Sequence, residues 1–208
     1  MTRLLSKLVF LMAACELLYS CAVTYTDMTG HMPRAHQVVD AESGAPVPNS
    51  IVVVYWNRTV TVIESNTSCD RALALMTDSN GRYELPLWAG RLPSIASVYK
   101  KGYSDATEWP AKGKGIDEVK RFTGTPMQRL QDLNRFGPRG CEDDEKKMAI
   151  LWVPIAEEAN ELAKTPEEKL KASDFQYLAD KSLHGIDEAR RMQVEREATI
   201  RNSMRKAR

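Results

Sequence analysis

The segment Ser50-Ile-Val-Val-Val-Tyr-Trp56 is a run of β-branched and aromatic side chains without the polar alternation of a half-exposed strand. A strand of this composition fits where both of its faces are covered. Shorter strand-like stretches, separated by turn residues, flank it at residues 36–40, 59–63, 71–77, 82–86 and 95–100. This series of short strands favours a small antiparallel β-sandwich over a parallel sheet.

A turn signal lies between two of these stretches, at Asp78-Ser-Asn-Gly81. Asn80 and Gly81 both tolerate positive φ, so the pair predicts a hairpin that joins strand 71–77 to strand 82–86. We expect the β-sandwich to span residues 36–104.

Three blocks in this region carry a resemblance: Val38 to Val47, Thr77 to Pro86, and Lys101-Gly-Tyr103. They resemble the carboxypeptidase regulatory-like family, whose members have a transthyretin-like fold of seven strands. The chain is also similar to proteobacterial lipoproteins that carry this domain. The resemblance implies a fold and no activity, because in metallocarboxypeptidases such a domain is an accessory to the catalytic one.

The first 20 residues have the pattern of an export signal. Arg3 and Lys7 precede an apolar run at residues 8–14, and no acid occurs before Glu16. The wider apolar stretch is interrupted by Glu16 and stops near Val23, so it is too short and too charged for a membrane-spanning helix. We therefore predict a signal peptide at residues 1–20, with an uncleaved anchor as the alternative.

Leu18-Tyr-Ser-Cys21 resembles a bacterial lipobox, the motif whose cysteine receives diacylglycerol. By this resemblance Cys21 is the lipidated, palmitate-bearing residue, and Cys15, after Met12-Ala-Ala14, is the alternative site. Ala22, rather than aspartate, follows Cys21, which favours the periplasmic face of the outer membrane over the inner membrane. Residues 21–35 lack periodicity and fit a tether.

Cysteine parity gives a second expectation. If Cys21 is lipidated, Cys15 leaves with the signal peptide, and Cys69 and Cys141 remain as a pair in an oxidising compartment. We predict a Cys69–Cys141 disulfide, with two unpaired buried thiols as the alternative. Because no cysteine or histidine spacing fits a zinc site, we expect no metal.

The C-terminal half has helical patterns. Residues 105–124 form a polar linker, and residues 125–208 a helical region. Thr125-Pro126 starts a helix that Gly137-Pro138 ends. A longer helix runs from about 143 to 164, with a kink or break expected near Trp152 because Pro154 lies inside it.

Thr165-Pro-Glu-Glu168 is a capping box that starts a further helix, which ends before Gly185. Its inward side chains are expected to be Leu170, Phe175, Leu178 and Leu183. From Ile186 onward the chain is polar and rich in arginine. We expect a solvated helix there, with a basic surface for anionic lipid or cell-wall polymer as the alternative.

Composition limits the function classes. The 208 residues carry 29 Lys+Arg against 28 Asp+Glu, a net charge of +1, which provides no field for gathering nucleic acid. The three histidines are His31, His36 and His184, and none begins a His-x-x-Glu motif. No cofactor is expected.

The sequence thus predicts an α+β, lipid-anchored protein of the cell envelope with a non-enzymatic interaction or structural role, whose partner is an envelope protein or a glycan. The alternative is a periplasmic binder of a peptide, glycan or small ligand, in a cleft between sheet and helices with Trp88, Tyr103 and Trp109 as contacts. An enzyme built from scattered residues, with the acids at 142–145 among them, is a third hypothesis.

Overall fold

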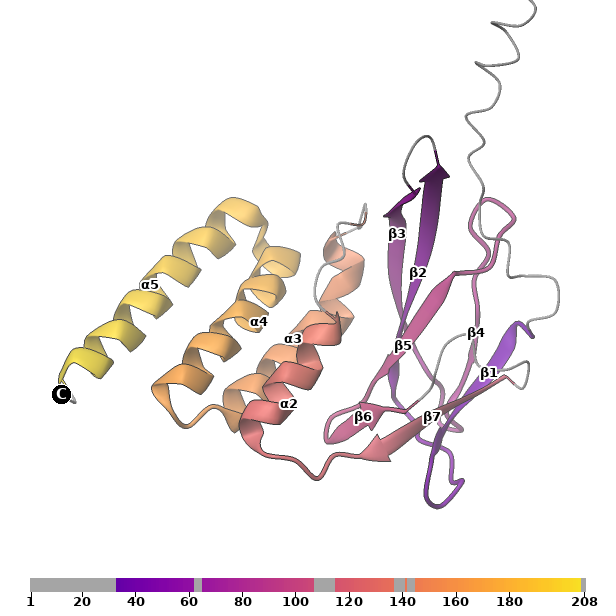
Figure 1. Ribbon diagram of the computed structural model, residues 1–208, viewed down its shortest axis with the longest axis horizontal. Helices are drawn as coiled ribbons and strands as arrows, with labels where there is room; N and C mark the ends of the chain where they lie inside the picture. Colours follow the sequence, from indigo (N-terminus) through magenta and orange to yellow (C-terminus); the bar gives the residue numbers. More distant parts are fainter. Residues whose placement is uncertain (1–32, 62–64, 107–114, 137–140, 142–144, 207–208) are drawn as a thin grey trace, which may run out of the picture.

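The computed structural model describes residues 33–61, 65–106, 115–136, 141 and 145–206. Within them the fold is α+β, with seven strands in two small sheets followed by four helices (Figure 1). The signal peptide, the lipidation sites Cys15 and Cys21, and the tether up to residue 32 lie outside the described residues.

The first sheet has four strands in the order β4-β1-β7-β6. Its strands are β1 (Ala35–Asp40), β4 (Arg82–Glu84), β6 (Tyr103–Asp105) and β7 (Ile116–Arg121). β1 and β7 are parallel, and the other neighbours are antiparallel. The second sheet is antiparallel, in the order β3-β2-β5, and consists of β2 (Ile51–Thr61), β3 (Ser65–Met76) and β5 (Ile95–Tyr99).

β2 is the central strand of the second sheet and contributes to two hydrophobic cores. Alternate residues pack with side chains of the four-stranded sheet: Val52, Val54 and Trp56. The others pack with side chains of the helices: Ile51, Val53 and Tyr55. The three-stranded sheet is therefore a middle layer, which explains why this strand is apolar on both faces.

The strands differ from the expectation in three places. Residues 51–61 form one strand, with a register shift between Trp56 and Asn57, where two strands were expected. β3 begins at Ser65 rather than near Arg71. The expectation of a linker at residues 105–124 is wrong in part, because residues 116–121 form β7 inside the first sheet.

The turn at Asp78–Gly81 also differs, because it does not close a hairpin. β3 belongs to one sheet and β4 to the other, so the turn carries the chain between sheets. Gly81 has a φ of 70°, and a Cβ there would lie 2.7 Å from the carbonyl oxygen of Val38. Glycine is thus required by the close approach to β1 as well as by the turn.

The helices are α2 (Pro126–Leu133), followed by the short η2 (Asn134–Phe136), then α3 (Glu145–Leu162), α4 (Pro166–His184) and α5 (Ile186–Lys206). Both expected starts are confirmed: Thr125 and Thr165 cap α2 and α4, each in a reciprocal capping box. Gly185, with a φ of 89°, follows α4 as expected. The expected stop at Gly137-Pro138 lies outside the described residues.

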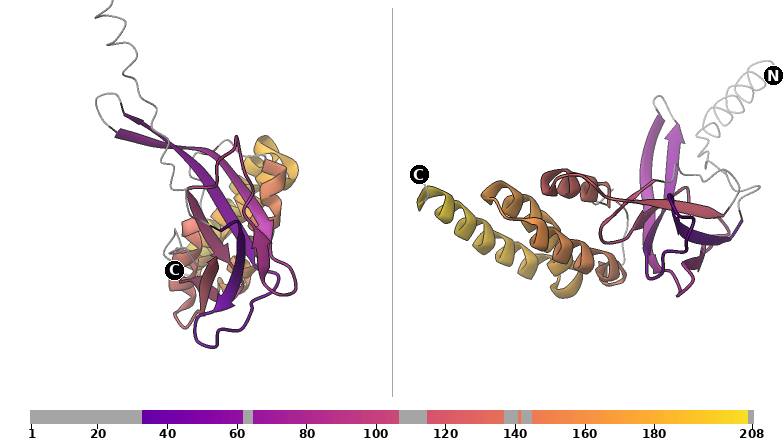
Figure 2. Two further views of the ribbon diagram at one scale, coloured as in Figure 1. Left: turned by 90° about the vertical axis from the view of Figure 1, so that its right-hand side faces the viewer. Right: turned by 90° about the horizontal axis from the view of Figure 1, so that it is seen from below.

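Of the kink or break expected near Trp152, the break does not occur, because α3 continues through Pro154. Trp152 and Ile155 on either side of the proline are buried in the core shared with the three-stranded sheet. This packing holds the helix together across the residue that lacks an N–H donor. Leu183, expected to point inward, is 53% exposed at the end of α4. The helices lie to one side of the sheets, with α5 farthest from them (Figures 1 and 2).

Candidate functional site

The three-stranded sheet and α3 meet at a junction that joins the two halves of the chain. Nineteen buried residues form its core, from β2, β3 and β5 on one side and from the helices on the other. The junction also contains the disulfide, a buried ion-pair network and a groove. We therefore describe it as the candidate site.

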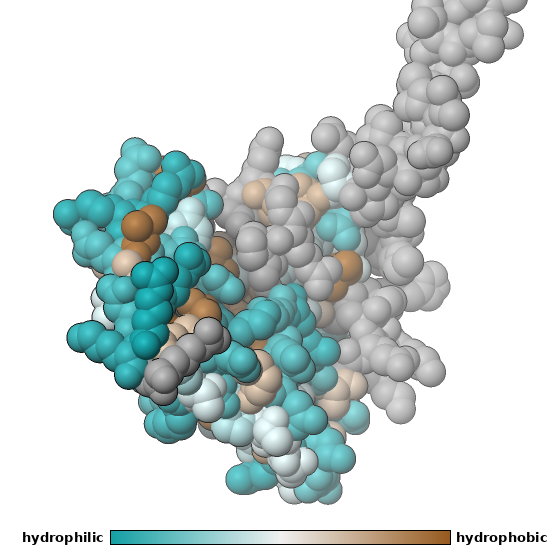
Figure 3. All heavy atoms as spheres, turned by 60° about the vertical axis from the view of Figure 1, so that its left-hand side comes forward, coloured by the Kyte–Doolittle hydropathy of each residue, from teal (hydrophilic) through white to brown (hydrophobic). Residues whose placement is uncertain are grey.

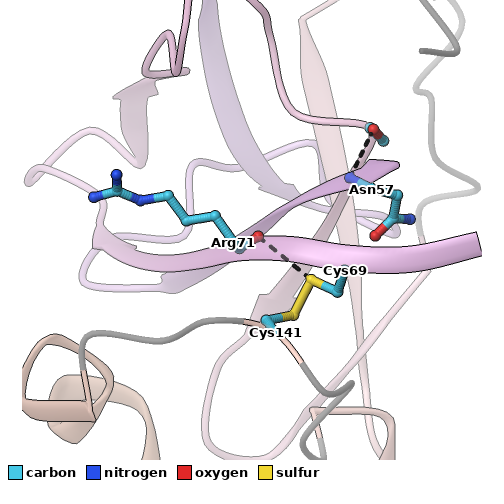
Figure 4. The surroundings of a disulfide bond; sticks show 5 residues. Asn57, Cys69, Arg71 and Cys141 are labelled. Atoms are coloured by element: carbon cyan, nitrogen blue, oxygen red, sulfur yellow. Dashed lines mark hydrogen bonds between the residues drawn. A yellow bond between two sulfur atoms is a disulfide. The ribbon is translucent and has the colours of Figure 1, made fainter. Parts of the chain in front are cut away.

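The disulfide between Cys69 and Cys141 is confirmed, and it spans a sequence separation of 72 residues (Figure 4). Cys69 is on β3 and Cys141 precedes α3, so the bond links the middle sheet covalently to the helical region. The sulfur of Cys69 lies 3.4 Å from the carbonyl oxygen of Arg71. This is a contact rather than a hydrogen bond, because a disulfide sulfur carries no proton.

Arg129 on α2 is the centre of the buried network, and only 2% of the residue is exposed. Its Nε and Nη2 donate to the two carboxylate oxygens of Glu158, at 2.9 and 3.1 Å. Its Nη1 donates to Asp132 at 2.7 Å, and its Nη2 also reaches the carbonyl oxygen of Lys100 at 3.2 Å. Phe122 packs against the guanidinium, with 5.5 Å from its carbon to the ring centroid. The bidentate pairing of Arg129 with Glu158 is a geometry in which a buried guanidinium has its hydrogen bonds satisfied.

Glu158 on α3 connects this arginine to the sheets. It accepts a hydrogen bond from the backbone N–H of Gly102 at 3.1 Å, and the Tyr99 hydroxyl lies 3.0 Å from its Oε2. Burial raises the pKa of the Tyr99 hydroxyl, and the nearby charge of Glu158 raises it further. Tyr99 therefore stays protonated and can donate to the carboxylate. The network thus joins α2, α3 and β5 by charged hydrogen bonds.

A groove of about 430 Å³ opens beside this network, between the second sheet and α3. We call it the sheet–helix groove, and its apolar lining includes Ile51, Met76, Ile150, Val153 and Pro154. Met76 is 57% exposed and Ile150 is 40% exposed, so two large apolar side chains face solvent at its edge.

Two lysines also line the sheet–helix groove, and both are engaged. The ammonium of Lys100 donates to the carbonyl oxygen of Pro48 at 2.7 Å, and Lys101 pairs with Glu161. The lining also includes Glu157, so the groove offers an apolar surface with one acidic side chain beside it.

Two of the three expected aromatic contacts, Trp88 and Tyr103, lie away from this groove. Trp88 follows β4, packs edge-on against Trp56 with ring centroids 6.2 Å apart, and has the Arg91 guanidinium over its ring. Tyr103 begins β6 and is covered by Arg121. Both are partly buried against the core between the two sheets, and neither lines the sheet–helix groove. Trp109 lies outside the described residues, as do the acids at 142–144.

A second buried cluster, in the four-stranded sheet, was missed from the sequence. Asp117 on β7 accepts a hydrogen bond from the Tyr83 hydroxyl at 2.7 Å, and His36 Nδ1 lies 3.1 Å from the same oxygen. The other ring nitrogen of His36 lies 3.0 Å from the carbonyl oxygen of Pro33. Both nitrogens face acceptors, so both hydrogen bonds form together only when both nitrogens carry a proton.

Burial gives the cluster of His36, Tyr83 and Asp117 a structural role. The His36 side chain has no exposed surface, and neither of its nitrogens is left to act on a substrate. Desolvation, together with the charge of Asp117, raises the pKa of the Tyr83 hydroxyl. The cluster therefore fastens β1, β4 and β7 together. Its one signal in the sequence is that strand periodicity puts His36 on the same side as the buried Val38.

Within the described part of the chain, no group of three His, Cys, Asp or Glu residues could hold a metal ion. No described helix is both long and apolar enough to cross a bilayer. The chain matches no protein-family model, no curated protein and no solved structure.

Proposed function

We propose that this chain is a lipid-anchored protein of the bacterial cell envelope, on the periplasmic face of the outer membrane, with a non-enzymatic interaction or structural role. The observation that carries the proposal is the Cys69–Cys141 disulfide. Structural disulfides persist in oxidising compartments and are rare in the cytosol. An exported protein can keep a disulfide that links the sheets to the helices, because its compartment is oxidising.

The anchor is proposed from the N-terminal sequence. A basic start, an apolar run and the lipobox-like residues 18–21 are the features of a lipoprotein signal. Cys21 would receive the acyl chains, and the residues up to 35 would separate the membrane from the body. Ala22 after Cys21 supports export to the outer membrane by the same resemblance.

We also propose that the sheets form a carboxypeptidase regulatory-like, transthyretin-like β-sandwich. Seven strands in two sheets support this, as does the shared core between them, to which β1 and β7 contribute Val38 and Val119. Such a domain fits a non-enzymatic role, because in the metallocarboxypeptidases it is an accessory to the catalytic domain.

Radiolabelled palmitate tests the proposal in a bacterium with two membranes. Cys21→Ala is expected to abolish labelling, and Cys15→Ala is the matched control because Cys15 would lie in the discarded peptide. Label that persists in Cys21→Ala, or that is lost only in Cys15→Ala, contradicts the assignment of the anchor. Recovery of the unaltered chain in the cytosol contradicts the whole proposal.

The sheet–helix groove favours a second candidate, a binder of extended peptides. Of the three ligand classes considered, a peptide with an apolar side chain fits best, because Met76 and Ile150 offer apolar contact and both lysines are engaged. Peptides selected from a displayed library on the immobilised protein should lose binding to Met76→Glu. They should keep binding to Leu87→Glu, which changes an equally exposed apolar residue outside the groove. Equal loss in both variants contradicts this candidate.

A further inference from the structure

A second groove lies within the helical region and involves neither the sheets nor the disulfide. Its volume is about 560 Å³, and it runs over the first half of α4 between the end of α3 and the middle of α5. We call it the helical groove. Figure 3 shows a face of the molecule on which brown hydrophobic residues lie among teal hydrophilic ones. A volume of this size is within the range of small-molecule sites.

The lining of the helical groove is amphiphilic. Its apolar part comes from Ala163 just after α3 and from Met192 and Ile200 on α5. Its cationic part comes from Lys169 on α4 and Arg196 on α5. Polar side chains complete the lining, and Glu195 is the one acid in it. Two cations beside an apolar surface favour a ligand that has an apolar body and a negative head.

Lys169 has no acidic partner among the described residues. Lys169 lines the groove near the start of α4. It is therefore available to a ligand anion, unlike the lysines of the sheet–helix groove.

Arg196 is held in place by one carboxylate. Its Nη1 lies 2.8 Å from Oδ2 of Asp180, whose side chain is only 4% exposed. Gln176 donates to the other oxygen of Asp180 at 3.1 Å. The ion pair orients the guanidinium at the wall of the groove.

The contact between Arg196 Nη1 and Asp180 Oδ2 is an ion pair without hydrogen-bond geometry, since Oδ2 has no hydrogen-bond partner in the described part of the chain. The Nε and Nη2 of Arg196 are also covered and have no acceptor there. A buried N–H without an acceptor is unfavourable, and a charged acceptor is the strongest partner that a guanidinium can gain. An anionic oxygen that enters the groove can supply it after a small movement of the side chain.

We propose that the helical groove binds a single-chain anionic amphiphile, a ligand with one acyl or alkyl chain and a carboxylate or phosphate head. The chain lies against Ala163, Met192 and Ile200, and the head lies between Lys169 and Arg196. The proposal does not depend on the lipid anchor or on the proposed function.

Isothermal titration of the full chain tests this proposal with four probes: dodecanoate, dodecyl phosphate, dodecanol and acetate. The two anionic amphiphiles are used below their critical micelle concentrations and dodecanol below its solubility limit. Dodecanoate or dodecyl phosphate is expected to bind at one site, about tenfold or more tighter than dodecanol. Acetate is expected not to bind measurably, because it lacks the chain. The ratio of the two anionic probes identifies the preferred head.

Three variants locate the site. Lys169→Gln is expected to weaken binding about threefold or more, and Thr199→Trp, which fills the groove without touching an ion pair, is expected to abolish it. Arg201→Gln is the matched control, since Arg201 is on the same helix but pairs with Glu197 outside the lining. Arg196→Gln is made together with Asp180→Asn, so that no buried carboxylate is left alone, and circular dichroism checks the fold.

Several results overturn the proposal. They are the absence of binding by both anionic probes, equal affinity for dodecanol, and an Arg201→Gln effect as large as that of Lys169→Gln. Undiminished binding to a folded Arg196→Gln/Asp180→Asn protein also overturns it.

Discussion

Replacing Arg129 with methionine tests whether the buried network joins the sheets to the helices. The substitution keeps an unbranched side chain of similar length and removes four hydrogen bonds: two to Glu158, one to Asp132 and one to the carbonyl of Lys100. Hydrogen bonds to charged groups contribute about 1.5–3 kcal/mol each, which would sum to roughly 6–12 kcal/mol. Removing the arginine also relieves the cost of keeping its charge out of water. The expected loss is therefore about 3–5 kcal/mol, as for other broken buried pairs.

Urea unfolding followed by circular dichroism measures this loss. Glu158→Gln is the partner variant, because it removes the charge while its single amide oxygen keeps an acceptor for the Gly102 N–H. The Tyr99 hydroxyl still has the carbonyl oxygen of Pro154 as an acceptor. The double variant Arg129→Met/Glu158→Gln is expected to be no less stable than Arg129→Met alone, since no buried charge is then unpaired. This corresponds to a coupling energy of about 2 kcal/mol or more. A loss below about 1 kcal/mol for Arg129→Met, or additive effects in the double variant, would refute the reasoning.

Three further perturbations follow from the described contacts. Cys69→Ser/Cys141→Ser is expected to lower the unfolding free energy by about 4 kcal/mol, because the bond no longer restricts the unfolded chain by closing a loop. Urea unfolding that finds the oxidised protein no more stable than the double variant would be inconsistent with this. Stability is expected to fall above pH 10, by about 1.4 kcal/mol per pH unit for each of Tyr83 and Tyr99. The reason is that burial raises both pKa values above the usual 10.0, so only the unfolded chain releases these protons. If replacing both tyrosines with phenylalanine leaves the slope of unfolding free energy against pH unchanged, this explanation is wrong. Gly81→Ala is expected to lower the unfolding free energy by at least about 2 kcal/mol, because it adds a contact of 2.7 Å with the Val38 carbonyl to the strain of a positive φ. Gly44→Ala has a similar φ but open space around the new Cβ, so it should lower the unfolding free energy less in the same assay.

Local patterns in the sequence predicted much of this fold. The apolar run at residues 51–56 predicted a strand covered on both faces, and β2 packs on both cores. The N-cap and proline at Thr125-Pro126 predicted the start of α2, and the capping box at Thr165 predicted the start of α4. Both signals depend on neighbours a few residues away, so they survive in a single sequence.

Elements decided by distant partners were missed. β7 was taken for linker because its inward positions are Asp117 and Val119, and a buried aspartate hides the alternation of a strand. Asp117 is buried because His36 and Tyr83, far along the chain, satisfy it. Arg129 and Glu158 were missed for the same reason: as charged residues in helical segments they are expected to be exposed, and they are buried only because the fold pairs them. The two cysteines were paired correctly because parity needs no knowledge of the fold.

The most direct test of the central claim is the intact mass of the protein extracted from membranes, measured after alkylation with and without reductant. We expect a chain that begins at a diacylglyceryl Cys21 and gains two alkyl groups only after reduction, at Cys69 and Cys141. A chain that retains Met1 without acyl chains, or that is alkylated at both cysteines before reduction, would contradict it.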